Sequence, residues 1–291
     1  MGRPADVATR GPGPQPTRIA GLPAIHAPAS GPRQDLAVLF AHGVLCDHTF
    51  FEPWVGWFSA AGFDAYAVSR RGRRGKPPTN SRGVTFSDFL EDTLNATRQL
   101  PHPLLLVGHS LGGILALKAA EQKACEALVL LAPVPPRGIL PLVRLRQLPP
   151  QLAQLTTVLT GGTFYPSLRQ ATAMFLGRIP VRQRPDLYRR YTPDSGLAVR
   201  STYLPGIPVD PPLLTTPLLC LVGEEDATIP PRSVAQVAQR YGGAFQSLSG
   251  HAHELVAEPG WEEVAAIVAA WAQRIPPRLP PRPGEASGSV V

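Results

Sequence analysis

The chain has 291 residues, 44% of them hydrophobic, which is enough for a large buried core in one or two domains. No stretch of eighteen uninterrupted apolar residues occurs, so the sequence argues against a membrane-spanning helix. The formal net charge is +7, but only Lys76, Lys118 and Lys123 are lysines, and this arginine excess beside 35 prolines indicates a compositional bias more than a nucleic-acid footprint.

The first quarter of the chain predicts a leader followed by strands and a helix. Residues 1–32 are rich in Pro, Gly and Arg and lack the apolar core of a secretory signal. Within them, we expect residues 1–16 to form a disordered, Pro-rich leader. A first strand or hairpin is expected at Thr17–Ala27, and single strands at Leu36–Ala41 and Phe63–Val68. The Leu36–Ala41 strand runs directly into His42-Gly43-Val44. A helix over Phe51–Ala61 ends at Gly62, which is typical of a helix C-terminus.

The densest basic run, Arg70–Lys76, follows the Phe63–Val68 strand. It contains no interleaved aromatic residue, and no zinc or helix-turn-helix pattern lies beside it. We therefore expect a solvated loop. Binding of nucleic acid or of an anionic membrane is the alternative, and such binding would weaken steeply with salt.

The central stretch of the sequence is a strand, a serine turn and a helix. The apolar run Leu104–Val107 is typical of a buried parallel strand, and Ile114–Ala120 consists of good helix formers. Between them, Gly108, Ser110 and Gly112 form a G-x-S-x-G pattern. A serine at such a junction must adopt a tight, strained turn, and the glycines leave room for it. The turn would raise the Ser110 hydroxyl above the sheet edge, at a helix N-terminus that favours negative charge.

The remaining elements continue the alternation of strands and helices. Helices are expected at Thr85–Leu100, Arg232–Tyr241 and Trp261–Arg274, and strands at Ala127–Ala132, Pro217–Gly223 and Ala244–Leu248. This order predicts an α/β fold with a mostly parallel sheet covered on both faces by helices. Residues 135–216 interrupt it with Pro-Pro pairs and no clean strand, so we expect a cap of short helices within a single domain spanning 17–275. Leu152–Leu159 and Ser167–Leu176 are the candidate amphipathic helices of this cap. Residues 276–291 predict a disordered tail.

Polar residues follow four of the predicted strands, where an open parallel sheet places its ligand site. They are His42-Gly43-Val44, Ser110, Asp226 and the pair His251 and His253. A serine hydroxyl is a poor nucleophile at neutral pH and needs an imidazole to take its proton. A carboxylate must then orient that imidazole, and the chain order serine, acid, histidine is that of nucleophile-elbow folds.

With these residues the chain resembles an α/β-hydrolase-fold serine hydrolase of the esterase and lipase type. The motifs that carry the resemblance are Ala41-His42-Gly43, Gly108-His109-Ser110-Leu111-Gly112-Gly113, Val222-Gly223-Glu224-Glu225-Asp226 and the segment from His253 to Trp261. They span the chain from about Leu36 to Arg274. The serine motif and the order of the motifs are specific for the fold, and none of them is specific for a substrate.

The resemblance implies a nucleophile and an acid. Ser110 matches the family nucleophile. Asp226 matches the family acid, because it follows a strand that ends in Gly-x-x-Asp, whereas Glu224 and Glu225 lack this spacing. The alternative for Asp226 is a solvated loop carboxylate.

Two histidines compete for the role of the base. Gly250-His251 mimics the common Gly-His of the family. The downstream frame, an acidic residue, Leu and then Glu258-Pro259-Gly260-Trp261, matches better when His253 is the base. We therefore predict His253 and retain His251 as the alternative.

The resemblance also implies two backbone donors for the developing oxyanion. One is the N–H of Leu111, directly after the nucleophile, and the other is the N–H of Val44, after His42 and Gly43. His42 and His109 are expected to be structural hydrogen-bonding residues and to take no part in the chemistry.

One loop departs from the family. Relatives carry Asp-x-Arg-Gly-x-Gly-x-Ser where this chain has Ser69-Arg70-Arg71-Gly72-Arg73-Arg74-Gly75-Lys76. The aspartate and the final serine are absent, and an extra residue separates the glycines. Because this loop flanks the site, we expect the change to bear on substrate preference more than on the chemistry.

The predicted function is hydrolysis of a carboxylic ester through an acyl-enzyme, with no metal and no organic cofactor. An apolar cap favours a small or medium hydrophobic acyl substrate. The same three side chains would serve a thioesterase, lactonase, carbon–carbon hydrolase, perhydrolase or acyltransferase. A non-catalytic ligand-binding sensor is the alternative from another class. Cys46, Cys125 and Cys220 are odd in number and lack metal spacing, so we expect reduced thiols in a cytoplasmic protein.

Overall fold

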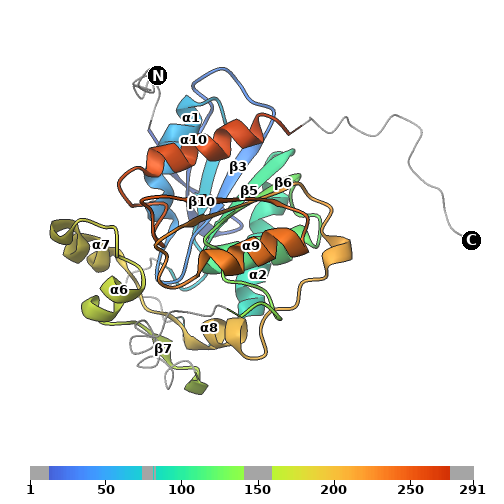
Figure 1. The fold of residues 1–291 in the computed structure, drawn as a ribbon. Helices are drawn as coiled ribbons and strands as arrows, with labels where there is room; N and C mark the ends of the chain where they lie inside the picture. The colour runs from blue at the N-terminus through green and yellow to red at the C-terminus, as the bar shows by residue number, and fades with distance from the viewer. Residues whose placement is uncertain (1–12, 74–80, 82, 141–158, 276–291) are drawn as a thin grey trace, which may run out of the picture.

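A twisted eight-stranded sheet forms the body of the computed structural model, which describes residues 13–73, 81, 83–140 and 159–275 (Figure 1). The strand order is β1-β2-β4-β3-β5-β6-β9-β10. The strands are β1 Gln15–Ile19, β2 Leu22–Ala27, β3 Ala37–Ala41, β4 Ala65–Val68, β5 Leu104–His109, β6 Ala127–Leu131, β9 Leu218–Gly223 and β10 Ala244–Leu248. Strands β4, β3, β5, β6, β9 and β10 run parallel, whereas β1 and β2 pair antiparallel.

Helices cover both faces of this sheet, as predicted. Their bounds are α1 Glu52–Ala60, α2 Phe86–Gln99, α3 Leu111–Ala120, α9 Pro231–Arg240 and α10 Trp261–Ala272. Helix α1 packs against α10 on one face, and α2 packs against α3 on the other (Figure 1). The predicted α/β class and mostly parallel sheet are therefore confirmed. No helix within the described residues is long and apolar enough to cross a membrane.

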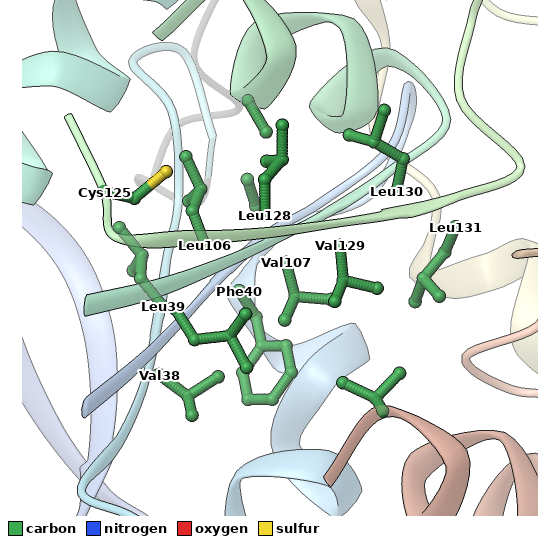
Figure 2. Packing of buried hydrophobic residues seen from close by; sticks show 14 of the residues in the cluster. Val38, Leu39, Phe40, Leu106, Val107, Cys125, Leu128, Val129, Leu130 and Leu131 are labelled. Atoms are coloured by element: carbon green, nitrogen blue, oxygen red, sulfur yellow. The ribbon is translucent and has the colours of Figure 1, made fainter. Parts of the chain in front are cut away.

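The central strands are buried on both faces, which explains their continuous apolar runs. All residues of β3, β5, β6 and β9 are buried. Along β6, Leu128 and Leu130 point to the face covered by α3, whereas Val129 and Leu131 point to the opposite face (Figure 2). This alternation with a period of two packs one strand into two helical layers at once.

The first two strands correct one predicted boundary. The expected segment Thr17–Ala27 is a hairpin, but its first strand begins at Gln15, so Gln15 and Pro16 belong to the sheet and not to a leader that ends at residue 16. Ala20 and Gly21 make the turn with positive φ angles of 50° and 76°. A two-residue turn of this kind matches the twist of antiparallel strands. Residues 1–12 and the predicted tail, 276–291, lie outside the described residues.

The cap lies beyond the carboxyl ends of the strands and is mainly helical (Figure 1). Its elements are β7 Thr163–Phe164, α6 Leu168–Met174, the 3₁₀ helix η3 Val181–Gln183, α7 Arg184–Arg190, β8 Asp194–Ser195, α8 Gly196–Tyr203 and the 3₁₀ helix η4 Pro211–Leu213. The expectation of no strand in this region is wrong, because β7 and β8 pair antiparallel. Two-residue strands are too short to show an alternating pattern. The helix expected at Leu152–Leu159 lies, except for Leu159, outside the described residues.

A second, smaller hydrophobic cluster joins this cap to the body. It contains Phe175, Leu187 and Tyr191 from the cap together with Leu45 from the loop after β3 and Phe50 from the 3₁₀ helix η1, His48–Phe51. The rings of Phe50 and Tyr191 stack with their centroids 5.7 Å apart. The cap core is therefore completed by residues of the sheet body.

The basic run after β4 is not a solvated loop over its described part. Arg70 and Arg73 are buried, with 4% and 2% of their surface exposed. Arg71 is more exposed and bonds to Asp92 on α2, both through its backbone N–H (2.7 Å) and through Nε (2.8 Å). The prediction failed because arginine is buried only when carboxylates and carbonyls surround it, and those partners come from distant segments. Residues 74–76 lie outside the described residues.

All three cysteines are free and buried. Burial raises the pKa of Cys46 well above its ordinary value and that of Cys220 to about 12. Both thiols are therefore protonated at neutral pH and act as small apolar side chains.

Candidate functional site

Ser110 occupies the sharp turn between β5 and α3. Its φ and ψ angles are 54° and −116°, a region that non-glycine residues rarely adopt. A Cβ at Gly108 would collide with the Gly112 carbonyl, and a Cβ at Gly112 would collide with the Ala41 carbonyl. The strain is offset by backbone hydrogen bonds from Ser110 N–H to Leu131 O (3.0 Å) and from Val134 N–H to Ser110 O (3.1 Å).

The structure brings the side chains of Ser110, His253 and Asp226 into one hydrogen-bonded chain. His253 Nε2 lies 3.1 Å from Ser110 Oγ, and His253 Nδ1 lies 2.8 Å from Asp226 Oδ2. All three side chains are buried. Three segments that are far apart in the sequence meet here because β5 and β9 end at the same edge of the parallel sheet, where the loop after β10 also returns.

The backbone around Asp226 determines how its carboxylate is used. Oδ1 accepts hydrogen bonds from the N–H groups of Thr228 (2.7 Å) and Ile229 (2.8 Å). With Oδ1 held by these two donors, Oδ2 faces His253. The carboxylate accepts from Nδ1–H, so Nε2 carries the free lone pair toward the Ser110 hydroxyl.

The protonation of His253 reflects two opposing causes. Burial alone would lower its pKa, but the charge of Asp226 and the hydrogen bond to it outweigh burial, so the pKa is raised above the ordinary value of 6.5. An imidazole can accept the serine proton and return it to a leaving group.

His251, the alternative base, faces elsewhere. Its Nδ1 lies 3.4 Å from Glu258 Oε2. Glu258 also accepts hydrogen bonds from the backbone N–H groups of Ala252 (2.8 Å) and Glu254 (3.0 Å). His251 therefore belongs to the support of the loop that carries His253. The nearby carboxylates Glu224 and Glu225 also point away, to Ser247 and to Arg178 of the cap, respectively.

His109 lies beside the site and supports the loop that carries His253. Its Nε2–H donates to the backbone carbonyl of His253 at 2.9 Å, and the two rings lie 5.2 Å apart. Burial, together with the nearby His253, lowers the pKa of His109 to about 3. His109 is therefore neutral at physiological pH and positions the backbone of the candidate base.

The segments expected to supply the oxyanion donors flank Ser110 on two sides. Leu111 is the first residue of α3 and follows Ser110 directly. Gly43 lies so close to the turn that an added Cβ would be 3.0 Å from His109 Nδ1 and 3.2 Å from Ser110 Cβ. The peptide between Gly43 and Val44 therefore lies against the nucleophile turn, where a donor to an oxyanion is needed.

His42 holds this peptide from one side. The backbone N–H of Arg70 donates to His42 Nε2 at 3.3 Å, so Nδ1 carries the proton and donates to Gly43 O at 2.9 Å. Burial, with smaller effects of Arg70 and Arg73, lowers the pKa of His42 well below its ordinary value. His42 is thus neutral and acts through hydrogen bonds.

Sequence analysis missed several buried polar residues near the site. The Tyr191 hydroxyl of the cap donates a hydrogen bond to Glu254 Oε1 at 2.8 Å. Glu254 directly follows His253 in the chain. Burial raises the pKa of Glu254. Asp194 of β8 is fully buried against Arg70 and Arg73. No local pattern marks these residues, because each is buried by a partner at least 60 positions away.

A metal centre finds no support in the described part of the chain. No group of three or more His, Cys, Asp or Glu side chains there could hold a metal ion. The polar side chains of the site instead satisfy one another through hydrogen bonds.

Solved structures with the same fold include lipases and an esterase. A monoacylglycerol lipase from Paleococcus ferrophilus is 19% identical, with a TM-score of 0.63, covering 86% of this chain and 98% of that one. A soluble variant of the monoglyceride lipase of Saccharomyces cerevisiae, in complex with a substrate analogue, is 14% identical, with a TM-score of 0.71, covering 94% and 99%. A thermophilic esterase from Thermogutta terrifontis is 19% identical, with a TM-score of 0.66, covering 90% and 99%.

At these identities the structural likeness establishes the fold and not the substrate. No curated protein sequence matches this chain. The sequence profile of the alpha/beta hydrolase family matches residues 38–267, which include every residue of the site described above. The chain belongs to the alpha/beta hydrolase family.

Proposed function

We propose that this protein is a serine hydrolase that cleaves a carboxylic ester through a covalent acyl-enzyme. The observation that carries the proposal is the hydrogen-bonded chain from Ser110 Oγ through His253 to Asp226, with distances of 3.1 and 2.8 Å. A serine on a strained turn, a base and an orienting carboxylate in this geometry are the parts that acyl transfer requires.

In the proposed mechanism, His253 Nε2 takes the proton of Ser110 as Oγ attacks the ester carbonyl. Asp226 stabilises the imidazolium that forms. The N–H groups of Leu111 and Val44 bind the oxyanion of the tetrahedral intermediate. The imidazolium then protonates the leaving alcohol, and a water activated by the same histidine hydrolyses the acyl-enzyme.

The proposed substrate class is a small or medium hydrophobic acyl ester. It is supported by the apolar side chains that the cap contributes beside the site, since the ring of Phe175 lies 5.4 Å from that of His253. The similar structures of lipases and an esterase support an ester as the substrate. The proposed chemistry requires no metal or organic cofactor, and the free thiols fit the cytoplasmic location expected from the sequence.

A fluorophosphonate probe tests the proposal. It should label Ser110 of the folded protein, and Ser110→Ala should abolish both labelling and hydrolysis of p-nitrophenyl esters. A folded protein that is not labelled and turns over none of a panel of aryl esters, acyl-CoA and lactones would refute it. Ligand-induced stabilisation without turnover, unchanged by Ser110→Ala, would favour the sensor function instead.

A further inference from the structure

The peptide that carries the Val44 N–H precedes a strained residue. Leu45 has a φ angle of 66°, in the left-handed region that side chains with a Cβ rarely adopt, and it is fully buried. Such a conformation persists only where the surrounding structure holds it. The residues that hold Leu45 therefore also determine where the neighbouring Val44 N–H points.

Two residues of the cap hold Leu45 through its backbone. Leu45 N–H donates to Asp194 Oδ2 at 2.9 Å, and Thr192 N–H donates to Leu45 O at 2.8 Å. Both polar groups of Leu45 are thus satisfied by a segment about 150 positions later in the chain. Asp194 is itself fixed, because its Oδ1 accepts from Ser195 N–H at 2.8 Å.

Arg70 holds the same peptide from the side of the sheet. Its Nη2 donates to Gly43 O at 3.0 Å, and its Nη1 donates to His42 O. Gly43 O belongs to the same peptide unit as the Val44 N–H. A cation bonded to the carbonyl polarises the peptide and makes its N–H a stronger donor.

An ion pair joins Arg70 to Asp194, the two side chains that hold the backbone on either side of Val44. Arg70 lies 3.7 Å from Asp194, and Arg73 pairs with the same carboxylate while donating to Thr192 O at 3.0 Å. Burial lowers the pKa of Arg70 to about 10, so it stays charged at neutral pH. The cluster places two cations against one carboxylate beside the proposed oxyanion position. Buried charges of this kind are weak contributors to stability, which leaves a positional role as their better explanation.

We infer that Asp194 and Arg70 are positioning residues for the oxyanion donor Val44, so that the cap completes the hole in which the transition state is bound. This inference rests on the proposed function. Arg70 occupies the variable position of the family pattern Asp-x-Arg-Gly, and Asp194 lies in the cap, so the device belongs to this chain and not to the shared motifs.

The decisive variant is Arg70→Met, which keeps the apolar stem and leaves Asp194 paired with Arg73. We expect kcat to fall about 10- to 100-fold with KM little changed, because loss of a whole oxyanion donor costs about 10²- to 10³-fold and a displaced donor costs less. The affinity for a trifluoromethyl ketone, which forms an oxyanion on Ser110, should fall in proportion to kcat/KM. Arg70→Lys should recover part of the loss, since one ammonium replaces one of the two donors. Asp194→Asn is the second variant should Arg70→Met fail to fold.

Ser195→Ala is the matched control. Ser195 lies next to Asp194, and its Oγ bonds to Val84 O and caps α8, but it does not touch Leu45 through its side chain. It should lower Tm while leaving kcat per probe-titrated site unchanged. Equal losses of kcat in Arg70→Met and Ser195→Ala at equal loss of Tm, or an unchanged affinity for the ketone, would overturn the inference. Failure of the proposed function would differ, since the wild-type protein would then neither hydrolyse esters nor be labelled at Ser110.

Discussion

The sheet body and the cap hold their polar side chains in different ways. In the body, Ser110, Asp226 and His253 lie on loops that follow strands. Backbone N–H groups of the body position Asp226, backbone hydrogen bonds hold the Ser110 turn, and the His109 side chain holds the backbone of His253. In the cap, Asp194 and Tyr191 are positioned by partners in the body. The polar side chains of the cap therefore depend on the body. The acid–base residues are hydrogen-bonded by groups of the body, and the cap touches them through Phe175 and through Tyr191 at Glu254.

This difference separates the two halves of the proposed chemistry. Proton transfer resides entirely in loops of the body, while the oxyanion side is shared between the loop after β3 and the cap. Changes in the body loops should therefore remove turnover without loosening the cap. Changes in the cap should act on stability and on the position of the oxyanion donor.

The largest effect is expected at His253. His253→Gln should lower kcat by about 10⁴- to 10⁶-fold, because the serine loses the group that takes its proton. His251→Gln is the matched control and should stay within a few-fold of the wild type, since His251 contacts Glu258 and not Ser110. Steady-state hydrolysis of p-nitrophenyl esters measures both. A larger loss in His251→Gln than in His253→Gln would reverse the assignment of the base.

The second largest loss of kcat is expected at Asp226. Asp226→Asn should lower kcat by about 10⁴-fold, because an amide favours the wrong tautomer of His253. Glu225→Gln removes a carboxylate from the same loop, where it pairs with Arg178 on the surface, and should change kcat very little. If kcat fell equally in the two variants, the loss would come from a general disturbance of this loop and not from the hydrogen bond between Asp226 and His253.

The free energies of unfolding of two Leu→Ala variants, one in the body and one in the cap, test how the two regions differ. Leu106 is fully buried in β5, and Leu106→Ala should cost about 2–5 kcal/mol. Leu187 of α7 is 8% exposed in the smaller cluster, and Leu187→Ala should cost about 2 kcal/mol or less. Urea unfolding measures both. If Leu187→Ala proved the more costly, the smaller cluster between cap and body would contribute more to stability than the core around β5.

The smallest effect concerns pH. The pKa of His253 is raised above 6.5, and the imidazole must be neutral to accept the serine proton. We expect kcat/KM to be constant at high pH and to fall about tenfold per unit below a midpoint above 6.5. Asp226→Asn should move that midpoint to lower pH, because it removes the charge that raises the pKa. A wild-type midpoint well below 6.5 would contradict this protonation scheme.

Patterns along the chain were sufficient for most of the body. Continuous apolar runs predicted the central strands, since a strand covered on both faces has no polar side. The glycines around Ser110 predicted the turn, because only glycine fits where backbones touch at Gly108 and Gly112. The frame before Trp261 favoured His253, which is the histidine that the structure brings to Ser110.

Only the tertiary structure decided the polar contacts between the cap and the body. The sequence around Arg70 and Arg73 does not indicate that both side chains are buried. The sequence around Asp194 likewise does not indicate that it is their shared partner. A single polar residue has no period, so local patterns detect apolar faces but not isolated ion pairs. Burial of a charge depends on what folds over it, and here that partner lies more than a hundred residues away.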